Sequence, residues 1–190
     1  AYDLKEISEY IDWTPFFRTW ELAGKYPNIL SDELVGEEAT KVFEDAKKML
    51  NQLIDEQWLE AKAAIGIWEA NTVNDNLIEV NNGAANFLQL RQQGKKAAGV
   101  PNISLADFIA PKSSNIQDYV GGFVVTTGLG IEEHIARFEA DHDDYNAIML
   151  KALADRLAEA FAELMHQKVR TEYWGYAANE NLENEELIKE

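Results

Sequence analysis

The sequence predicts an α+β fold, in which a largely antiparallel, bent β-sheet is flanked by long amphipathic helices. Two long segments, 36–57 and 144–172, place apolar residues three and four positions apart, as in a helix that buries one face. Between them lie shorter segments rich in β-branched and aromatic residues, of which 118–127 is the strongest. Because the strands are grouped rather than alternating with helices, an antiparallel sheet is favoured over a parallel one.

The N-terminal region predicts two short helices and a turn before the first long helix. Apolar residues on one side of 3–11 indicate the first short helix. Thr14 is expected to cap the second, because Pro15 then occupies the first helical position. The run Gly-Lys-Tyr-Pro-Asn at 24–28 predicts the turn that leads toward the helix at 36–57, whose apolar stripe extends to Trp58.

The middle of the chain predicts the strands. Segments 63–73 and 77–80 flank the turn residues Asn-Asp-Asn at 74–76 and therefore predict a hairpin. A third strand is expected at 86–90 and a fourth at 118–127. Two adjacent glycines in the fourth strand indicate a bulge or a close approach of the backbone.

The fourth strand leads through Thr-Thr-Gly-Leu-Gly at 126–130 into a predicted helix at 131–141. This run lacks the third glycine of a dinucleotide-binding loop and the lysine of a P-loop, so a strand-to-helix turn is favoured over a phosphate site. Asp143 and Asp144 are expected to cap the helix at 144–172.

The 190 residues predict one domain, and the chain is expected to be a fragment cut from something longer, because it has no initiator Met and ends in an unfinished helical pattern. Its predicted organisation is a series of five segments: an N-terminal helical segment 1–35, a long helix 36–58, a sheet region 63–127, long helices 131–172 and an acidic tail helix 179–190.

Composition excludes several classes of protein. The chain has 17 Lys and Arg against 34 Asp and Glu, a net charge of −17, which argues against nucleic acid and against an anionic membrane surface as partners. A hydrophobic content of 46% argues against disorder. Since there is no cysteine, no signal peptide and no apolar run long enough for a membrane span, a cytoplasmic location is predicted.

Acidic residues on the last long helix are the first candidates for chemistry. Asp155, Glu159 and Glu163 follow one another at intervals of four residues and so share a helix face, where like charges repel. Arg156 is placed to pair with Glu159 or Glu163. The residues alone leave two readings open, an ordinary solvated face or a contact with a cationic group of a ligand.

The histidines give little support for a metal site. None of the three is spaced from another like a pair of zinc ligands on a helix. His142 precedes Asp143 and Asp144, for which a polar turn is favoured over the alternative of a carboxylate and histidine metal site. No metal site and no catalytic residue are therefore predicted.

Three groups of residues together resemble the activation domain of cobalamin-dependent methionine synthase, the module that binds S-adenosylmethionine. The resemblance covers about residues 10–190. It is carried by Ile-Asp-Trp-Thr-Pro-Phe-Phe at 11–17 with Trp20 and 24–27, by Leu-Ala-Asp-Phe-Ile-Ala-Pro at 105–111, and by 142–146, 151–163 and 173–176.

The resemblance implies a role in repair within an enzyme of methionine biosynthesis that uses homocysteine and 5-methyltetrahydrofolate. In that family the module presents S-adenosylmethionine for reductive remethylation of inactive cob(II)alamin. The implied partners are the cobalamin-binding domain of the same parent chain and a flavodoxin or flavoprotein reductase. Cobalamin, and the zinc of the substrate modules, are implied to reside in other domains, so the isolated chain is expected to have no turnover.

The resemblance also implies site residues. Asp12 and Glu159 match positions where the family places carboxylates around the methionine end of S-adenosylmethionine. Charge-assisted hydrogen bonds from the ligand's ammonium group suit such carboxylates. Asp155 and Glu133 are implied as contacts with the cobalamin module, and a solvated helix face remains the alternative for both. Asp12 is also suited to cap the turn at 14–17.

One family motif is missing from this sequence. The main ligand motif, Arg-x-x-x-Gly-Tyr-Pro, does not occur, and the stretch from Arg170 to Ala177 is one residue longer and lacks the proline. The chain is thus expected to be the N-terminal half to two-thirds of the domain, with weak or no binding of S-adenosylmethionine. The alternative function is an interaction domain that docks a reductase or the cobalamin module without binding the ligand. A basic patch of Arg91, Lys95 and Lys96 is the predicted docking surface for an acidic reductase.

Overall fold

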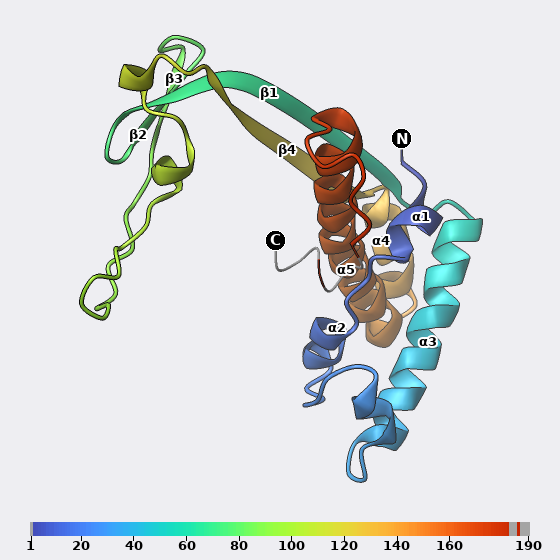
Figure 1. Cartoon of the computed structure of the whole chain (residues 1–190). Coiled ribbons are helices and arrows are strands. Elements are labelled where there is room, and N and C mark those ends of the chain that lie inside the picture. The colour runs from blue at the N-terminus through green and yellow to red at the C-terminus, as the bar shows by residue number, and fades with distance from the viewer. Residues whose placement is uncertain (1, 183–185, 187–190) are drawn as a thin grey trace. The chain divides into compact units, whose positions relative to one another are not determined.

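The computed structural model describes residues 2–182 and 186 and confirms the α+β class. It divides into two compact units, one formed by residues 1–64 and 124–190 and the other by residues 65–123. The first unit contains all the α-helices, and the second contains the hairpins of the sheet (Figure 1). The expectation of a single, partial domain stays a prediction.

The helical unit is built around α5, against which α1, α2, α3 and α4 pack (Figure 1). Large side chains of α5, among them Leu153, Leu157 and Phe161, are fully buried in the interface with these helices. Burial of one apolar face against several neighbours accounts for most of a helix's stability. The helical elements are α1 (Leu4–Ser8), α2 (Thr14–Thr19), η1 (Asn28–Ser31), α3 (Gly36–Asp55), α4 (Ile131–Ala140), α5 (Asp144–Lys168) and the π-helical turn η4 (Val169–Tyr173).

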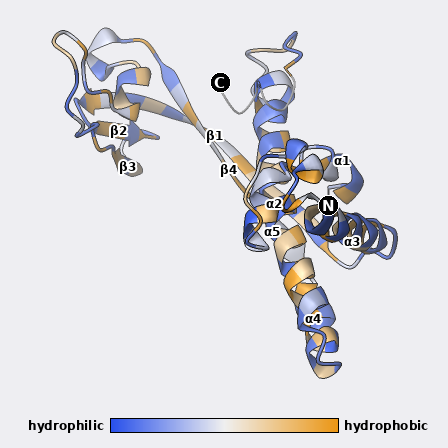
Figure 2. Ribbon diagram, turned by 90° about the horizontal axis from the view of Figure 1, so that it is seen from below, coloured by the Kyte–Doolittle hydropathy of each residue, from blue (hydrophilic) through white to orange (hydrophobic). Residues whose placement is uncertain are grey.

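Helix α3 follows the predicted apolar stripe but ends earlier than the pattern suggested. Val42, Met49 and Leu53 are buried along the stripe, and the exposed side is hydrophilic (Figure 2). The helix ends at Asp55, and Gln57 has a positive φ of 53°, which turns the chain. Trp58, expected on the helix stripe, therefore lies beyond the helix and is buried there instead.

The start of α2 corrects one prediction. Thr14 is the first helical residue rather than the cap, and the cap position is held by Trp13 without a side-chain bond. The Thr14 backbone N–H donates to Asp12 Oδ1 at 2.8 Å, while Thr14 Oγ1 accepts from the Tyr26 backbone N–H at 3.3 Å. Asp12 thus accepts a hydrogen bond from a free backbone N–H at the start of α2. This is the capping role predicted from the sequence as the alternative for Asp12.

Helix α5 begins as predicted but ends sooner. The Asp143 carboxylate accepts from the Asn146 backbone N–H at 3.1 Å, which confirms the predicted cap. The α-helix stops at Lys168, four residues short of the expected end, and the chain continues as the π-helical turn. Residues 183–185 and 187–190 of the predicted tail helix lie outside the described residues.

The strands form a four-stranded sheet in the order β3-β2-β1-β4. Neighbours β1 and β2 pair antiparallel with Ala70 opposite Val80, and β2 and β3 pair antiparallel with Val80 opposite Ala85. A small core of Ala70, Ile78, Val80 and Ala106 is buried within the second unit. The strands are β1 (Glu60–Asn74), β2 (Leu77–Val80), β3 (Ala85–Leu88) and β4 (Asp118–Leu129).

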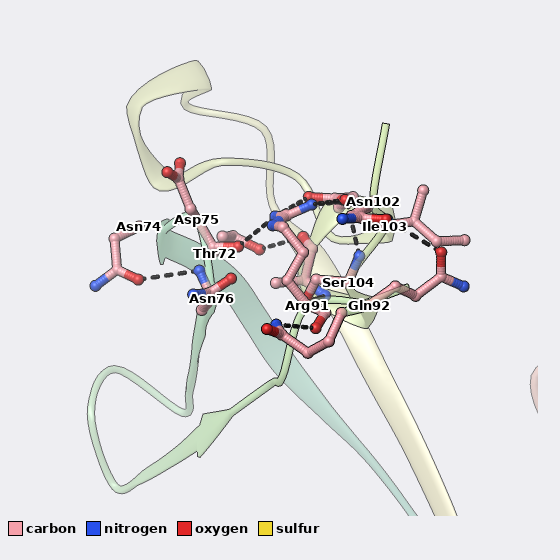
Figure 3. A network of polar contacts seen from close by, with 12 residues as sticks. Thr72, Asn74, Asp75, Asn76, Arg91, Gln92, Asn102, Ile103 and Ser104 are labelled. Carbon is pink, nitrogen blue, oxygen red and sulfur yellow. Dashed lines mark hydrogen bonds and ion pairs between the residues drawn. The ribbon is translucent and has the colours of Figure 1, made fainter. Parts of the chain in front are cut away.

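Arg91 holds the loops of the second unit together (Figure 3). Its two terminal nitrogens each donate to the Asp107 carboxylate at 2.7 Å, and they also donate to the carbonyl oxygens of Asn102 and Asp75 at 2.7 Å. The guanidinium predicted to dock a partner is therefore already engaged inside this unit. The docking role of the predicted patch stays a prediction, which now rests on Lys95 and Lys96.

The Arg91 contact makes Asp107 a source of acid sensitivity. Hydrogen bonds from Arg91, joined by one from the Ser104 backbone N–H, lower the pKa of Asp107 to about 2. An ionised carboxylate with a depressed pKa stabilises the fold above its unfolded pKa near 4, and that contribution is lost as the pH falls toward 2. We expect Asp107→Asn to be less stable than the parent at pH 6 and to lose this part of the pH dependence. Urea unfolding between pH 2 and pH 6 measures the free energy of unfolding of both proteins. If that free energy changes with pH in the same way in the two proteins, the role of Asp107 is contradicted.

Candidate ligand-binding site

Two carboxylates of α5 are joined by one buried guanidinium. Arg156 donates to Asp155 Oδ2 at 2.6 Å and to both oxygens of Glu159, at 2.7 and 2.8 Å. The Arg156 side chain is only 8% exposed, whereas those of Asp155 and Glu159 are 67% and 64% exposed. The arginine is therefore held inside while the two carboxylates face solvent.

This arrangement leaves Glu159 able to accept further hydrogen bonds. Burial acts to lower the pKa of Arg156, but its bonds to Asp155 and Glu159 outweigh burial and raise the pKa. The guanidinium is thus permanently charged and fixes the orientation of the carboxylate. Each carboxylate oxygen has a second lone pair, which an ammonium group in solution can reach.

The predicted pairing of Arg156 with Glu159 is confirmed, and Asp155 is its second partner in place of Glu163. Glu163, one turn further along α5, is partly buried. Desolvation, with a smaller effect from the charge of Glu159, raises the pKa of Glu163. Glu163 therefore has a different environment from Asp155 and Glu159, the two acids that contact Arg156.

Strand β4 holds this part of α5 in place through a buried hydroxyl. Thr127 Oγ1 donates to the Ala154 carbonyl oxygen at 3.0 Å, and Thr127 is 1% exposed. Leu153 and Leu157 anchor the same turn in the core. The sequence placed Thr127 in the strand-to-helix run at 126–130, but it gave no sign that the Thr127 hydroxyl would bond to α5.

Asp12 is an exposed residue of the segment that joins α1 to α2, the two short helices that pack on α5. Its Oδ1 atom is used by the start of α2. Within the described residues, no hydrogen bond or ion pair joins Asp12 to Glu159. The structure thus places both residues in the helical unit without linking them directly.

Polar contacts tie the N-terminal segment to the end of α5. Tyr10 Oη donates to Gln167 Oε1 at 2.5 Å, and Lys168 Nζ lies 2.9 Å from Glu6 Oε1. The bond to Glu6 raises the pKa of Lys168, so the Lys168 ammonium group keeps its charge. These contacts fix the segment that leads to Asp12 relative to the helix that carries Glu159.

The remaining candidates are not joined to these carboxylates. Glu133 lies in the first turn of α4, and no bond of the described residues links it to Asp155. His142 has a positive φ of 54°, and the Asp143 carboxylate beside it is occupied by Asn146. Over residues 2–182 and 186, no group of three or more His, Asp or Glu is arranged to hold a metal ion.

The described part of the chain has no helix that is both long enough and apolar enough to cross a membrane.

A family model described as the activation domain of vitamin B12 dependent methionine synthase matches residues 3–190. The chain belongs to this family. The resemblance inferred from the sequence motifs is thereby confirmed.

A solved structure supports the same family assignment. The chain is similar to a protein described as the MetH reactivation domain bound to AdoHcy, with a TM-score of 0.91 and 52% sequence identity. The match covers 99% of this chain and 59% of that chain. This chain thus spans about three-fifths of the length of the chain that it matches. The α+β fold is shared over nearly all of the present chain.

Proposed function

We propose that this chain is part of an activation module that binds S-adenosylmethionine for the reductive remethylation of cob(II)alamin in methionine biosynthesis. The single observation that carries the proposal is the exposed carboxylate of Glu159, oriented by buried Arg156, in a chain 52% identical to a domain described as bound to AdoHcy. AdoHcy is the product that S-adenosylmethionine becomes when it gives up its methyl group.

Glu159 and Asp12 are the proposed contacts for the methionine end of the ligand. Carboxylates attract its ammonium and sulfonium groups, and the exposed oxygens of Glu159 can accept a charge-assisted hydrogen bond. Arg156 prevents the side chain of Glu159 from rotating away, which reduces the entropy lost on binding. Asp155 and Glu133 are proposed contacts with the cobalamin module, since both are exposed.

The proposed partners lie outside this chain. When bound by its own domain in the parent enzyme, cobalamin supplies the cobalt that accepts the methyl group after one-electron reduction by a flavodoxin or flavoprotein reductase. The residues of this chain bind and orient the methyl donor and take no proton or electron themselves. The parent's methyltransferase activity and a cytoplasmic location belong to the same proposal, and the chain alone is proposed to have no turnover.

The missing Arg-x-x-x-Gly-Tyr-Pro motif gives the first test of this function. We expect a longer chain that contains the motif to bind S-adenosylmethionine measurably by calorimetry. The chain of 190 residues should bind far more weakly, because it has no guanidinium of that motif for the ligand's carboxylate. Equal affinities for the two chains would contradict the assigned role of the motif, and no binding by either would favour a pure interaction domain.

Glu159→Gln in the longer chain tests the carboxylate itself. Loss of a charge-assisted bond is expected to weaken binding by about tenfold to a hundredfold, since such bonds contribute about 1.5–3 kcal/mol. Glu44→Gln, an equal change of charge on the exposed side of α3, is the matched control and should leave the affinity unchanged. If both variants lose affinity equally, the effect comes from net charge and Glu159 is not a contact.

A further inference from the structure

A second candidate site lies in the helical unit, in a cavity of about 730 Å³ between α3, α4 and the start of α5. Its lining includes the aromatic side chains Trp58, Phe138 and Tyr145 and the cations Lys48 and Arg137. Cavities of this size that combine apolar walls with a few charged groups are typical of small-molecule sites. None of these residues belongs to the proposed S-adenosylmethionine contacts.

The acidic groups around this cavity are already occupied. The Tyr145 hydroxyl donates to Asp45 Oδ2 at 2.8 Å. Burial, together with this contact, raises the pKa of Tyr145 to about 12, so the hydroxyl keeps its proton. Glu56 accepts hydrogen bonds from Trp58 Nε1 at 2.7 Å and from Gln52 Nε2 at 3.0 Å.

The two cations are not held by a carboxylate in direct contact within the described residues, although the charge of Arg137 is one of the smaller causes that lower the pKa of Glu56. Neither Arg137 nor Lys48 forms an ion pair within 4.0 Å in the described part of the chain. The Arg137 guanidinium lies over aromatic rings, 5.0 Å from the Trp58 centroid and 5.2 Å from the Phe138 centroid. Stacking occupies the face of a guanidinium and leaves the N–H groups at its edge free to donate.

His134 completes the support of Trp58. Its ring stacks on the indole at 4.4 Å with an interplanar angle of 14°, one helical turn before Arg137. The Trp58 ring is thus held by a neighbour on α4 and by its bond to Glu56. Because Trp58 is only 6% exposed, it supports Arg137 from behind, and the aromatic surface open to a ligand is that of Phe138 and Tyr145. Aromatic surface with positive charge beside it favours a planar ligand that carries a negative group.

We propose that the cavity lined by Phe138, Tyr145, Arg137 and Lys48 binds a small aromatic anion, a planar ring that bears a sulfonate, carboxylate or phosphate group. The ring packs against the aromatic side chains, and the anionic group receives hydrogen bonds from Arg137 and attraction from Lys48. This site is independent of the proposed function, because it shares no residue with it.

Calorimetry with naphthalene-2-sulfonate tests the proposal, with the neutral naphthalene-2-sulfonamide as a ligand of the same shape. We expect the sulfonate to bind at least tenfold more tightly than the sulfonamide. Arg137→Gln and Lys48→Gln should each weaken binding of the sulfonate by about twofold to fivefold, within the range for an exposed ion pair.

Two charge-matched variants control for non-specific binding. Arg18→Gln on α2 and Lys41→Gln on α3 remove exposed cations that do not line the cavity, and they should leave the affinity unchanged. Equal binding of the two naphthalenes would overturn the proposal, because exposed apolar residues such as Phe108 would then explain the binding. Equal losses in the control variants and in Arg137→Gln would overturn it as well.

Discussion

Replacing Phe161 with alanine will lower the free energy of unfolding by about 3–5 kcal/mol, the usual range for a buried phenylalanine. The Phe161 side chain is 0% exposed on α5, and its ring lies 4.8 Å from that of Tyr2. Removing it deletes apolar contact and leaves a cavity among helices that pack on several sides, where neighbours cannot collapse fully into the space. Urea unfolding followed by circular dichroism measures the change.

Phe108→Ala is the matched control for this substitution. Phe108 is 70% exposed, so the same loss of atoms removes little buried surface, and the expected change is within about 0.5 kcal/mol. A loss of less than about 1 kcal/mol for Phe161→Ala would contradict the placement of α5 at the centre of the helical core.

Gly130→Ala is expected to lower the free energy of unfolding by about 2–4 kcal/mol, because backbone strain and a steric clash act together. Gly130 lies between β4 and α4 with a φ of 97°, which an L side chain rarely adopts. A Cβ atom there would meet the backbone carbonyl oxygen of Trp58 at 2.8 Å. Because this neighbour is backbone, it cannot move aside as a flexible side chain would.

Two other glycines separate these contributions. Gly99 has a φ of 84° but open space around its Cβ position, so Gly99→Ala reports strain alone, about 1 kcal/mol. Gly94 has open space and no positive φ, so Gly94→Ala should change stability by only a few tenths of a kcal/mol. If Gly130→Ala and Gly99→Ala lower the free energy of unfolding equally in chemical denaturation, the contact between the added Cβ atom and the Trp58 carbonyl oxygen imposes no cost.

Local patterns in the sequence were sufficient for the helices and for part of the candidate site. The stripe of α3, the Asp143 cap and the pairing of Arg156 with Glu159 all join residues within a few positions, so their spacing predicts them. The strand-to-helix turn before α4 was predicted for the same reason.

Contacts between distant segments could not be predicted in this way. Thr127 and Ala154 are 27 positions apart, and Arg91 and Asp107 are 16 apart, with no periodicity to connect them. Trp58 was assigned to the stripe of α3 because its spacing fits, whereas the backbone turn at Gln57 removes it from the helix. The roles of Asp12, Glu159, Asp155 and Glu133 stay predictions, since they depend on a ligand and a partner domain.

The charge of the cluster on α5 has a consequence for product release. Two carboxylates and one guanidinium give Asp155, Arg156 and Glu159 a net formal charge of −1. S-adenosylmethionine carries an ammonium, a sulfonium and a carboxylate, so it is a net monocation, and loss of the methyl group makes it a neutral zwitterion. Under the proposed function, the cluster attracts the methyl donor more strongly than the spent product. Added salt should reduce the difference in affinity between S-adenosylmethionine and its demethylated product, because salt screens exposed charges.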